Sequence, residues 1–234
     1  MDQQEIVLKL FEFVILVFAL SLHEASHAWM ASRLGDQTAR MLGRVTLNPI
    51  KHIDPIGTVL IPLAMLFLGS YGRFLIGWAK PTPVNTRNFR RIVRDDILTT
   101  LAGPASNVIT AIGAFILLMV LKSTSLDGKQ SVIAAVFSAN HIMPLEGGLP
   151  TLFPLAMLLY LAILLNIFLA VFNLLPLPPL DGSHIFRHML PYRALRVYDS
   201  LGMISLILML LIGGPIVALF TSPAMAVFNS LLLS

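Results

Sequence analysis

The run LHEASHAW, residues 22–29, lies at the end of an apolar stretch that begins near Ile6. On an α-helix, side chains four residues apart share one face, so His23 and His27 can bind the same metal ion. Glu24 lies about 100° further round the same turn, where its carboxylate can act on a water molecule without binding the metal. The run therefore predicts a metal site with a general base beside it.

The spacing of these side chains is the H-E-x-x-H pattern of zinc hydrolases. The chain contains no cysteine, so a metal would be bound by His, Asp or Glu. Two histidines and a carboxylate are costly in a helix embedded in hydrocarbon, and such residues usually mark function. This setting favours a metal site over the simpler alternative, a polar helix end packed against its neighbours.

The composition of the chain is that of a membrane protein. Of its 234 residues, 56% are hydrophobic and only 12% are charged, and the mean hydropathy is +0.83. Such a chain is too apolar for an ordinary soluble domain and indicates several membrane spans. The net charge of +4 comes from basic connecting segments, which indicates orientation in a membrane and no binding of nucleic acid. We expect residues 1–234 to form a single intramembrane domain.

Apolar segments long enough to cross a bilayer occupy residues 6–30, 97–121, 151–172 and 200–220. A further apolar segment, residues 55–79, lies between two basic segments that should both be cytoplasmic. About 25 residues are too few for two crossings, so we expect a re-entrant element there. The predicted fold is an all-α, polytopic helical bundle.

A short strand or β-hairpin is expected after the first span. GRVTLNP, residues 43–49, combines β-branched residues with a turn signal. The basic loops also place the metal site near the cytoplasmic side but within the bilayer, because His23 lies about 25 Å along a helix from Ile6. An edge of this strand would be suited to bind an extended substrate by β-addition.

The block NLLPLPPLDG, residues 173–182, contains the candidate for a third ligand. Its three prolines cannot continue a helix and predict an extended segment after the third span. Asp181 would then either cap a helix beginning near Ser183 or bind the metal. We favour ligation, because the two histidines otherwise lack a partner.

These blocks together resemble the site-2 protease family of intramembrane zinc metalloproteases. The resemblance rests on HEASH, on LAGPASN at residues 101–107 and on NLLPLPPLDG, which occur in the family's order and span most of its catalytic core. GRVTLNP and WAKPTPVN are also similar to segments of small prokaryotic members, the type without PDZ or CBS domains. The resemblance implies a multi-pass protein of a prokaryotic cell membrane that cleaves transmembrane protein substrates.

The resemblance also implies individual roles. One Zn²⁺ per chain would be bound by His23, His27 and Asp181, and Glu24 would activate water. The proline-rich block, including Pro176, would lie along the unwound substrate, which Asn173 would help to hold. From the residues alone, Asn107 faces either a partner helix or the active site, and we expect it at the substrate.

Other readings remain open. The metal cluster would also fit a metal-ion transporter, and the fold would also fit an inactive family member that only binds membrane helices. His184 and His188 repeat the four-residue spacing, but their arginine-bearing loop favours a solvated face. Glu12 shares the helical face of His23 and either lines a substrate route or pairs with Lys9.

Overall fold

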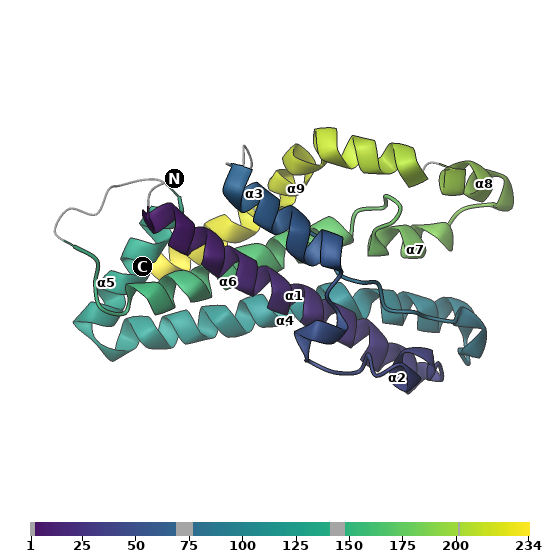
Figure 1. Ribbon diagram of the computed structural model, residues 1–234, viewed down its shortest axis with the longest axis horizontal. Helices are drawn as coiled ribbons and strands as arrows, with labels where there is room; N and C mark the ends of the chain where they lie inside the picture. The colour runs from purple at the N-terminus through teal and green to yellow at the C-terminus, as the bar shows by residue number, and fades with distance from the viewer. Residues whose placement is uncertain (1–2, 69–76, 141–147, 201) are drawn as a thin grey trace.

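The computed structural model describes residues 3–68, 77–140, 148–200 and 202–234 (Figure 1). These residues are mainly helical, and none of them lies in a β-strand. The helices are, in chain order, α1 (Gln3–Leu34), α2 (Thr38–Met41), η1 (Pro49–Lys51), η2 (Pro55–Leu60), α3 (Ile61–Leu68), η3 (Thr86–Asn88), α4 (Ile92–Thr124), α5 (Leu126–Ala139), α6 (Phe153–Asn173), α7 (Asp181–Arg187), α8 (Tyr192–Ser200) and α9 (Gly202–Leu233).

Among the described residues, four helices are long and apolar enough to cross a membrane: α1, α4, α6 and α9. Large apolar side chains cover their outer surfaces; Ile109 of α4 is 69% exposed and Phe18 of α1 is 59% exposed. Side chains of this kind are suited to contact lipid. The predicted all-α polytopic architecture is confirmed, although α9 continues to Leu233, well beyond the predicted end of the fourth span at residue 220.

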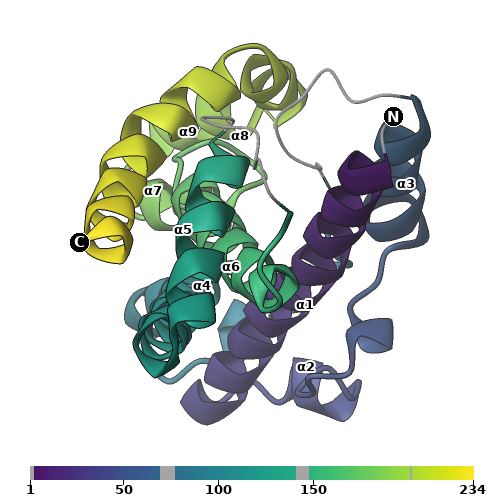
Figure 2. The same cartoon turned by 90° about the vertical axis from the view of Figure 1, so that its left-hand side faces the viewer.

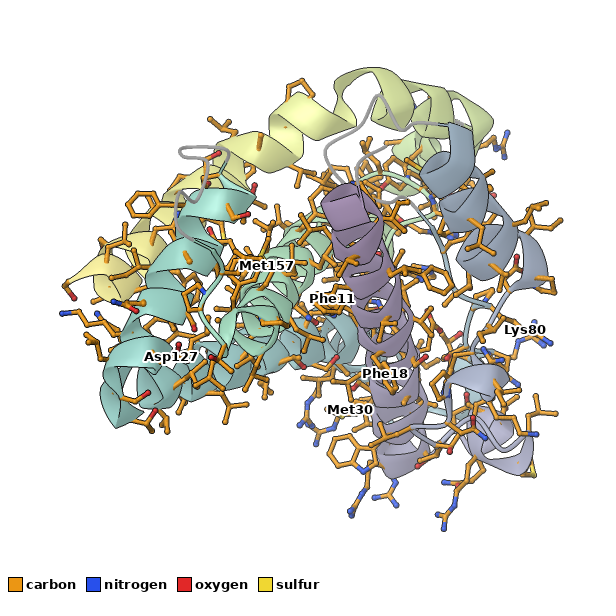
Figure 3. All side chains as sticks on the ribbon, turned by 60° about the vertical axis from the view of Figure 1, so that its left-hand side comes forward. Phe11, Phe18, Met30, Lys80, Asp127 and Met157 are labelled. Carbon is orange, nitrogen blue, oxygen red and sulfur yellow. The ribbon has the colours of Figure 1, made fainter. Side chains whose placement is uncertain are left out.

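Helix α6 is the centre of the bundle and packs against α1, α4, α5 and α9. In Figure 2, α1 and α3 lie to one side of α6, and α9 lies to the other. Met157 of α6 points into the core and is 1% exposed (Figure 3). The Tyr160 hydroxyl donates to Asn229 at 2.9 Å and accepts from Asn140 at 3.0 Å. These two hydrogen bonds join the end of α5 to α6 and α9, so they fix how the three helices are oriented relative to one another.

Helix α5 lies in the connection between the second and third predicted spans, where no helix was predicted. Ser125 caps it, because its hydroxyl accepts a hydrogen bond from the Gly128 N–H at 3.0 Å. Asp127, in the first turn, accepts from the N–H groups of Thr151 and Leu152 at 3.1 and 3.2 Å. The start of α5 is thereby connected to the start of α6. The polar residues at the start of α5 make these contacts, while the interior of the helix is apolar.

The predicted strand or β-hairpin at residues 43–49 is wrong. The N–H groups of Gly43 and Arg44, which a strand would offer to a partner, donate instead to carbonyl groups of α2. Asn48 then begins η1, where its side chain accepts from the Ile50 N–H at 3.1 Å. Local capping has taken the backbone groups that a hairpin would need, so this segment offers no strand edge to a substrate.

The two described ends of the apolar segment at residues 55–79 contact each other. Helices η2 and α3 form its outgoing part, and its residues 69–76 lie outside the described residues. On the return, the Trp78 N–H donates to the Gly57 carbonyl at 3.2 Å. The Thr58 hydroxyl donates to the Trp78 carbonyl at 2.6 Å. The two ends of the segment therefore lie side by side.

Asp36, just beyond α1, is completely buried and binds groups that are distant in sequence. It accepts from the N–H and hydroxyl of Thr38, from the Asn85 N–H at 2.7 Å and from the Asn88 side chain at 2.8 Å. Burial by itself would raise the pKa of Asp36, but these hydrogen bonds outweigh it and the pKa is lowered. The ionised carboxylate thus joins the end of α1 to the segment before α4.

This joint predicts a pH-dependent loss of stability. A carboxylate whose pKa is lowered by folding stabilises the protein above its unfolded pKa of about 3.9, and this contribution disappears as the pH falls through the folded pKa. Asp36→Asn should therefore lower the free energy of unfolding at pH 7 by about 1–3 kcal/mol, the usual value for hydrogen bonds to a charged group. The difference from the original protein should shrink below about pH 4.

Denaturant unfolding in detergent, followed at pH 7 and at pH 3, measures this difference. The control is Asp199→Asn, because the Asp199 side chain is 42% exposed in a surface ion pair with Arg187 and should contribute little. A difference of the same size at both pH values would contradict the role given to the charge of Asp36.

Candidate metal centre

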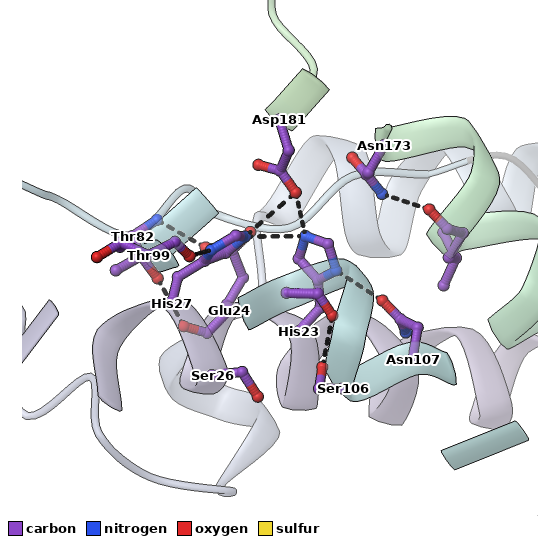
Figure 4. A network of polar contacts seen from close by, with 12 residues as sticks. His23, Glu24, Ser26, His27, Thr82, Thr99, Ser106, Asn107, Asn173 and Asp181 are labelled. Carbon is purple, nitrogen blue, oxygen red and sulfur yellow. Dashed lines mark hydrogen bonds and ion pairs between the residues drawn. The ribbon is translucent and has the colours of Figure 1, made fainter. Parts of the chain in front are cut away.

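Three potential ligands converge inside the bundle. Helix α1 presents His23 and His27 one turn apart, with their Nε2 atoms separated by 3.0 Å (Figure 4). Asp181, the first residue of α7, places its Oδ2 atom 3.0 Å from the Nε2 of His23 and 3.3 Å from that of His27. The ligand atoms all lie within 4.8 Å of one another. Among the described residues, these form the one group of this kind suited to a metal ion.

The proline-rich block brings Asp181 back over the end of α6. The block does not form the extended segment that was expected, because the N–H groups of Leu177 and Leu180 donate to carbonyls two and three residues earlier. Proline fixes φ near −65°, which suits turns as well as extended chain. Gly182 then lies against the Leu174 carbonyl, where a Cβ atom would come within 2.2 Å of its oxygen. A larger residue would push α7, and Asp181 with it, away from the histidines.

The two ends of helix α7 differ in what surrounds them. The residue in its N-cap position is Leu180, so Asp181 does not cap the helix. At the other end, His188 lies 2.7 Å from the Asp96 carboxylate of α4, and Asp96 is only 8% exposed. His184 and His188 are both exposed, as expected, and His188 in addition pairs with Asp96. The Asp96 contact attaches α7 to the helix that packs behind the cluster.

A chain of hydrogen bonds fixes the protonation of His23. The Ala162 carbonyl can only accept, so the side-chain NH₂ of Asn166 donates to it at 2.8 Å. The Asn166 oxygen then accepts from the Asn107 NH₂ at 2.8 Å. This leaves the Asn107 oxygen facing Nδ1 of His23 at 2.6 Å, so Nδ1 carries the proton. The Nε2 atom of His23, which faces Asp181, is therefore the ring nitrogen left to bind a metal ion.

His27 reaches the same state by a shorter route. Its Nδ1 lies 2.7 Å from the Thr99 carbonyl, which can only accept, so the proton again resides on Nδ1. The two Nε2 atoms and the Asp181 carboxylate then face one another in a buried space, an arrangement that a shared cation would stabilise. Two imidazoles and a carboxylate, with the second ring nitrogens held by carbonyl-type acceptors, are the donors of catalytic zinc sites. The cluster fits Zn²⁺.

Gly103 leaves room for an ion. A Cβ atom at this position of α4 would lie 2.3 Å from Nε2 of His27 and 2.6 Å from Nε2 of His23. Such distances are far below van der Waals contact, so any side chain here would occupy the space between the ligands. Gly103 therefore lets α4 lie close to the candidate ligand atoms of both histidines.

Glu24 lies on the turn that bears the histidines and is held by a segment from elsewhere in the chain. The Thr82 N–H donates to Oε2 of Glu24 at 2.7 Å. The Thr82 hydroxyl also donates to the Glu24 main-chain carbonyl at 3.0 Å. Figure 4 shows the carboxylate beside His27, with Thr82 on its other side.

The residues expected at the substrate differ in their surroundings. Asn107 is completely buried and binds His23 and Asn166, so its contacts here support the histidine. Asn173 lies near Asp181 in Figure 4, and its NH₂ donates to the Leu169 carbonyl at 2.9 Å. Pro176 is exposed. A contact between these residues and a substrate stays a prediction.

Glu12, which shares the face of His23, lies further along α1. It is 7% exposed and forms an ion pair with Lys9 at 2.9 Å. The local pairing considered from the sequence is therefore present. It lets a carboxylate reside inside the span at a lower cost than an unpaired charge.

Comparisons with known proteins agree with this architecture. A model of peptidase family M50 matches residues 11–213. The chain is 39% identical over 178 residues to the "Putative zinc metalloprotease YwhC" of Bacillus subtilis, an alignment that covers 76% of this chain and 68% of that protein. It is 33% identical over 96 residues to the "Putative zinc metalloprotease Rip2" of Mycolicibacterium smegmatis, covering 41% of this chain and 35% of that protein. No solved structure gives a significant match.

The fold and the cluster define a polytopic membrane protein with a buried His–His–carboxylate group. The chain belongs to peptidase family M50, which confirms its resemblance to the site-2 proteases. This membership also confirms the expected class of enzyme, a zinc metalloprotease, and the expected cofactor, Zn²⁺.

The residues that surround the candidate ligands differ in how far they could be recognised from the sequence. Asn166 carried a usable signal, because a lone amide in an apolar span usually has a buried partner. Gly103 lies four residues before Asn107, which places both on one face of α4. Thr82 and the Thr99 carbonyl carried none, since only the folded chain brings them to Glu24 and His27.

The space beside Gly103 predicts the effect of adding one methyl group. Gly103→Ala should abolish zinc binding, because the new Cβ would lie among the ligand atoms and force the histidines apart. The matched control is Gly113→Ala on the same helix, where a Cβ atom would meet nothing within 4 Å. Zinc content of the two purified variants, measured by elemental analysis, decides the matter. A Gly103→Ala protein that binds zinc as the original does would contradict this geometry.

Proposed function

We propose that the chain hydrolyses peptide bonds within or near transmembrane segments of membrane protein substrates. In this proposal His23, His27 and Asp181 bind one zinc ion per chain, and Glu24 is the general base. The observation that carries it is the convergence of these ligand atoms, within 4.8 Å of one another, inside a bundle of membrane-spanning helices. Both histidines are buried, so the reaction takes place away from bulk water.

The chemistry follows from what each group can do. When bound, zinc supplies Lewis acidity, which polarises the scissile carbonyl and acidifies water. Glu24 removes a proton from the attacking water and returns it to the nitrogen of the departing amine, so that its carboxylate is regenerated. Asn107 and the Thr99 carbonyl accept from Nδ1 of the two imidazoles, which orients the rings and leaves each Nε2 as the nitrogen that would bind the metal. No side chain forms a covalent bond with the substrate in this scheme.

The substrate is proposed to bind in an unwound state. A peptide bond within a helix is shielded by its own hydrogen bonds, so the helix has to open before water can attack. Residues 173–180 leave α6 as turns beside Asp181, and exposed Pro176 lies on this path. Asn173 lies at the start of it, where a side-chain amide can bond the freed backbone of a substrate.

The membrane orientation is also proposed. His27 lies about 10 Å along α1 from Leu34, so the cluster is near one end of the span. At that end Arg33 lies over the Trp29 ring at 5.4 Å, a pairing suited to a membrane interface. Basic residues dominate the adjoining segments, so this end is assigned to the cytoplasm of a prokaryotic cell, which accords with the bacterial relatives. The adjacent ends of residues 55–79 support a re-entrant element.

The assignment of roles is tested by separating metal binding from catalysis. Glu24→Gln should lower cleavage of a transmembrane peptide by about a hundredfold or more while zinc content is unchanged, because an amide cannot accept the proton. His23→Ala and His27→Ala should lose zinc and activity together. Asp181→Asn should bind zinc more weakly, since an amide is a poorer ligand than a carboxylate. Zinc content and peptide cleavage are measured on each purified variant, with and without chelator.

Ser26→Ala is the control within the same motif, because the Ser26 hydroxyl only donates to a carbonyl of its own helix at 2.7 Å. It should cleave normally. Full activity in Glu24→Gln would refute the assigned base. Zinc transport into proteoliposomes without cleavage would favour the transporter, and binding of the peptide without cleavage would favour the inactive helix binder.

The orientation predicts which positions are accessible from each side. Because the chain has no cysteine, single cysteines can be introduced directly. Cysteines at Met41, which is 79% exposed, and at exposed Arg91 should react with a membrane-impermeant maleimide only from the cytoplasm. A cysteine at exposed Lys129 should react only from outside. Labelling of positions 41 and 91 from opposite sides would show that residues 55–79 make a full crossing.

A further inference from the structure

Residues 80–85, the sequence KPTPVN, cross α1 at the metal centre without being part of any helix. Thr82 of this segment makes both of its polar contacts with Glu24, one to the carboxylate and one to the main-chain carbonyl. The two residues are 58 positions apart in the chain. A glutamate on a helix surface has three rotatable side-chain bonds, and the Thr82 N–H selects one orientation of its carboxylate.

The sequence of the segment singles out the Thr82 amide. Thr82 lies between Pro81 and Pro83, and neither proline has an N–H group. Each proline also disfavours helical backbone at the residue before it, which favours extended conformations at Lys80 and at Thr82 itself. Thr82 therefore offers an isolated donor on a stiff piece of chain, which is suited to holding an acceptor in one place.

The segment is fastened on both sides of Thr82. Before it, the guanidinium of Arg44 donates to the carbonyls of Lys80 and Pro81, with a distance of 3.1 Å to Pro81. Arg44 is only 5% exposed, which is unusual for arginine, and its guanidinium also donates to the Lys51 carbonyl at 2.5 Å. After it, the Asn85 N–H donates to the buried carboxylate of Asp36 at 2.7 Å.

We propose that residues 80–85 are a strap that orients the general base. The Thr82 N–H binds Oε2 of Glu24 and leaves Oε1 to take the proton from water, while Arg44 and Asp36 keep the strap in register. Thr82 and Arg44 are thus positioning residues, and the proposal rests on the proposed role of Glu24 as the base. A base misplaced by about 1 Å can cost on the order of a hundredfold in rate, so fixing this carboxylate has catalytic value.

The test removes the donor while leaving the shape of the strap. Thr82→Pro extends the run of prolines, keeps an extended backbone and deletes the N–H group. We expect kcat to fall by about 10-fold to 100-fold, with KM and zinc content close to those of the original protein. Thr82→Val deletes only the hydroxyl and should lower kcat less than about threefold. Val84→Pro introduces a proline into the same strap at an amide that does not donate to Glu24, and it should lower kcat less than Thr82→Pro does.

A Thr82→Pro protein whose kcat equals that of the unsubstituted protein would overturn the proposal. So would a loss of zinc or of thermal stability in Thr82→Pro that accounts for its loss of activity, because the strap would then be only structural. Arg44→Gln should reproduce the fall in kcat with zinc retained, since it frees the Lys80 and Pro81 carbonyls. An Arg44→Gln protein with original kcat would show that the fastening has no catalytic role.

A second measurement does not depend on activity. Hydrogen exchange at the Thr82 amide should be slow in the metal-free protein and faster in Glu24→Ala, while exchange at Asn85 stays the same in both. Equal exchange at Thr82 in the two proteins would overturn the contact even if Thr82→Pro fails to fold. If the original protein cleaves no peptide, the proposed function fails, whereas this exchange still decides whether the strap holds Glu24.

Discussion

The structure depends on the meeting of two imidazole lone pairs and one carboxylate inside an apolar bundle. Placing these groups together is unfavourable unless each has the right protonation state and a cation to share. The protein sets the protonation through acceptors that cannot donate: the Ala162 carbonyl, acting through Asn166 and Asn107, and the Thr99 carbonyl. Each pair of a histidine and its acceptor joins α1 to α4, so the arrangement of the helices and the ligand geometry are one constraint.

Backbone geometry supplies the remaining conditions. Gly103 keeps α4 close to the Nε2 atoms without filling the space between them, and Gly182 lets α7 approach the end of α6. The apolar outer surfaces of the spans impose little on the site, since lipid-facing side chains can vary without moving the ligands. Polar groups are concentrated instead at one end of the bundle, where Asp96 holds His188 and Asp36 holds the segment before α4. The spans therefore bury the site, and the connecting segments hold the ends of the helices in place.

The sequence predicted those parts of this arrangement that local periodicity determines. Helical spacing placed His23, His27 and Glu24 on adjoining faces of one turn, and hydropathy found the four spans. Asp181 lies 154 residues beyond His27, so spacing alone left capping and ligation open, and the two histidines without a further partner favoured ligation. The strand predicted at residues 43–49 is absent because α2 and Asn48 make hydrogen bonds with the backbone of this segment. The β-branched residues on which the prediction rested do not reveal those hydrogen bonds. Helix α5 was missed because its polar ends concealed an apolar interior. Thr82 is visible only in the fold.

Glu24 and the histidines place opposite demands on their surroundings. A ligand histidine is best held by acceptors, which raise its electron density, whereas a carboxylate base is best held by a donor on one oxygen. The molecule meets both demands from different sources: the histidines are bound from within the bundle by α4, and Glu24 from its margin by Thr82. The two partners of the site can therefore respond separately to substitution. On the proposed roles, a change in α4 should alter metal binding first, while a change in residues 80–85 should alter the rate with the ligands in place. This separation follows from adjacent residues of one helical turn facing different neighbours.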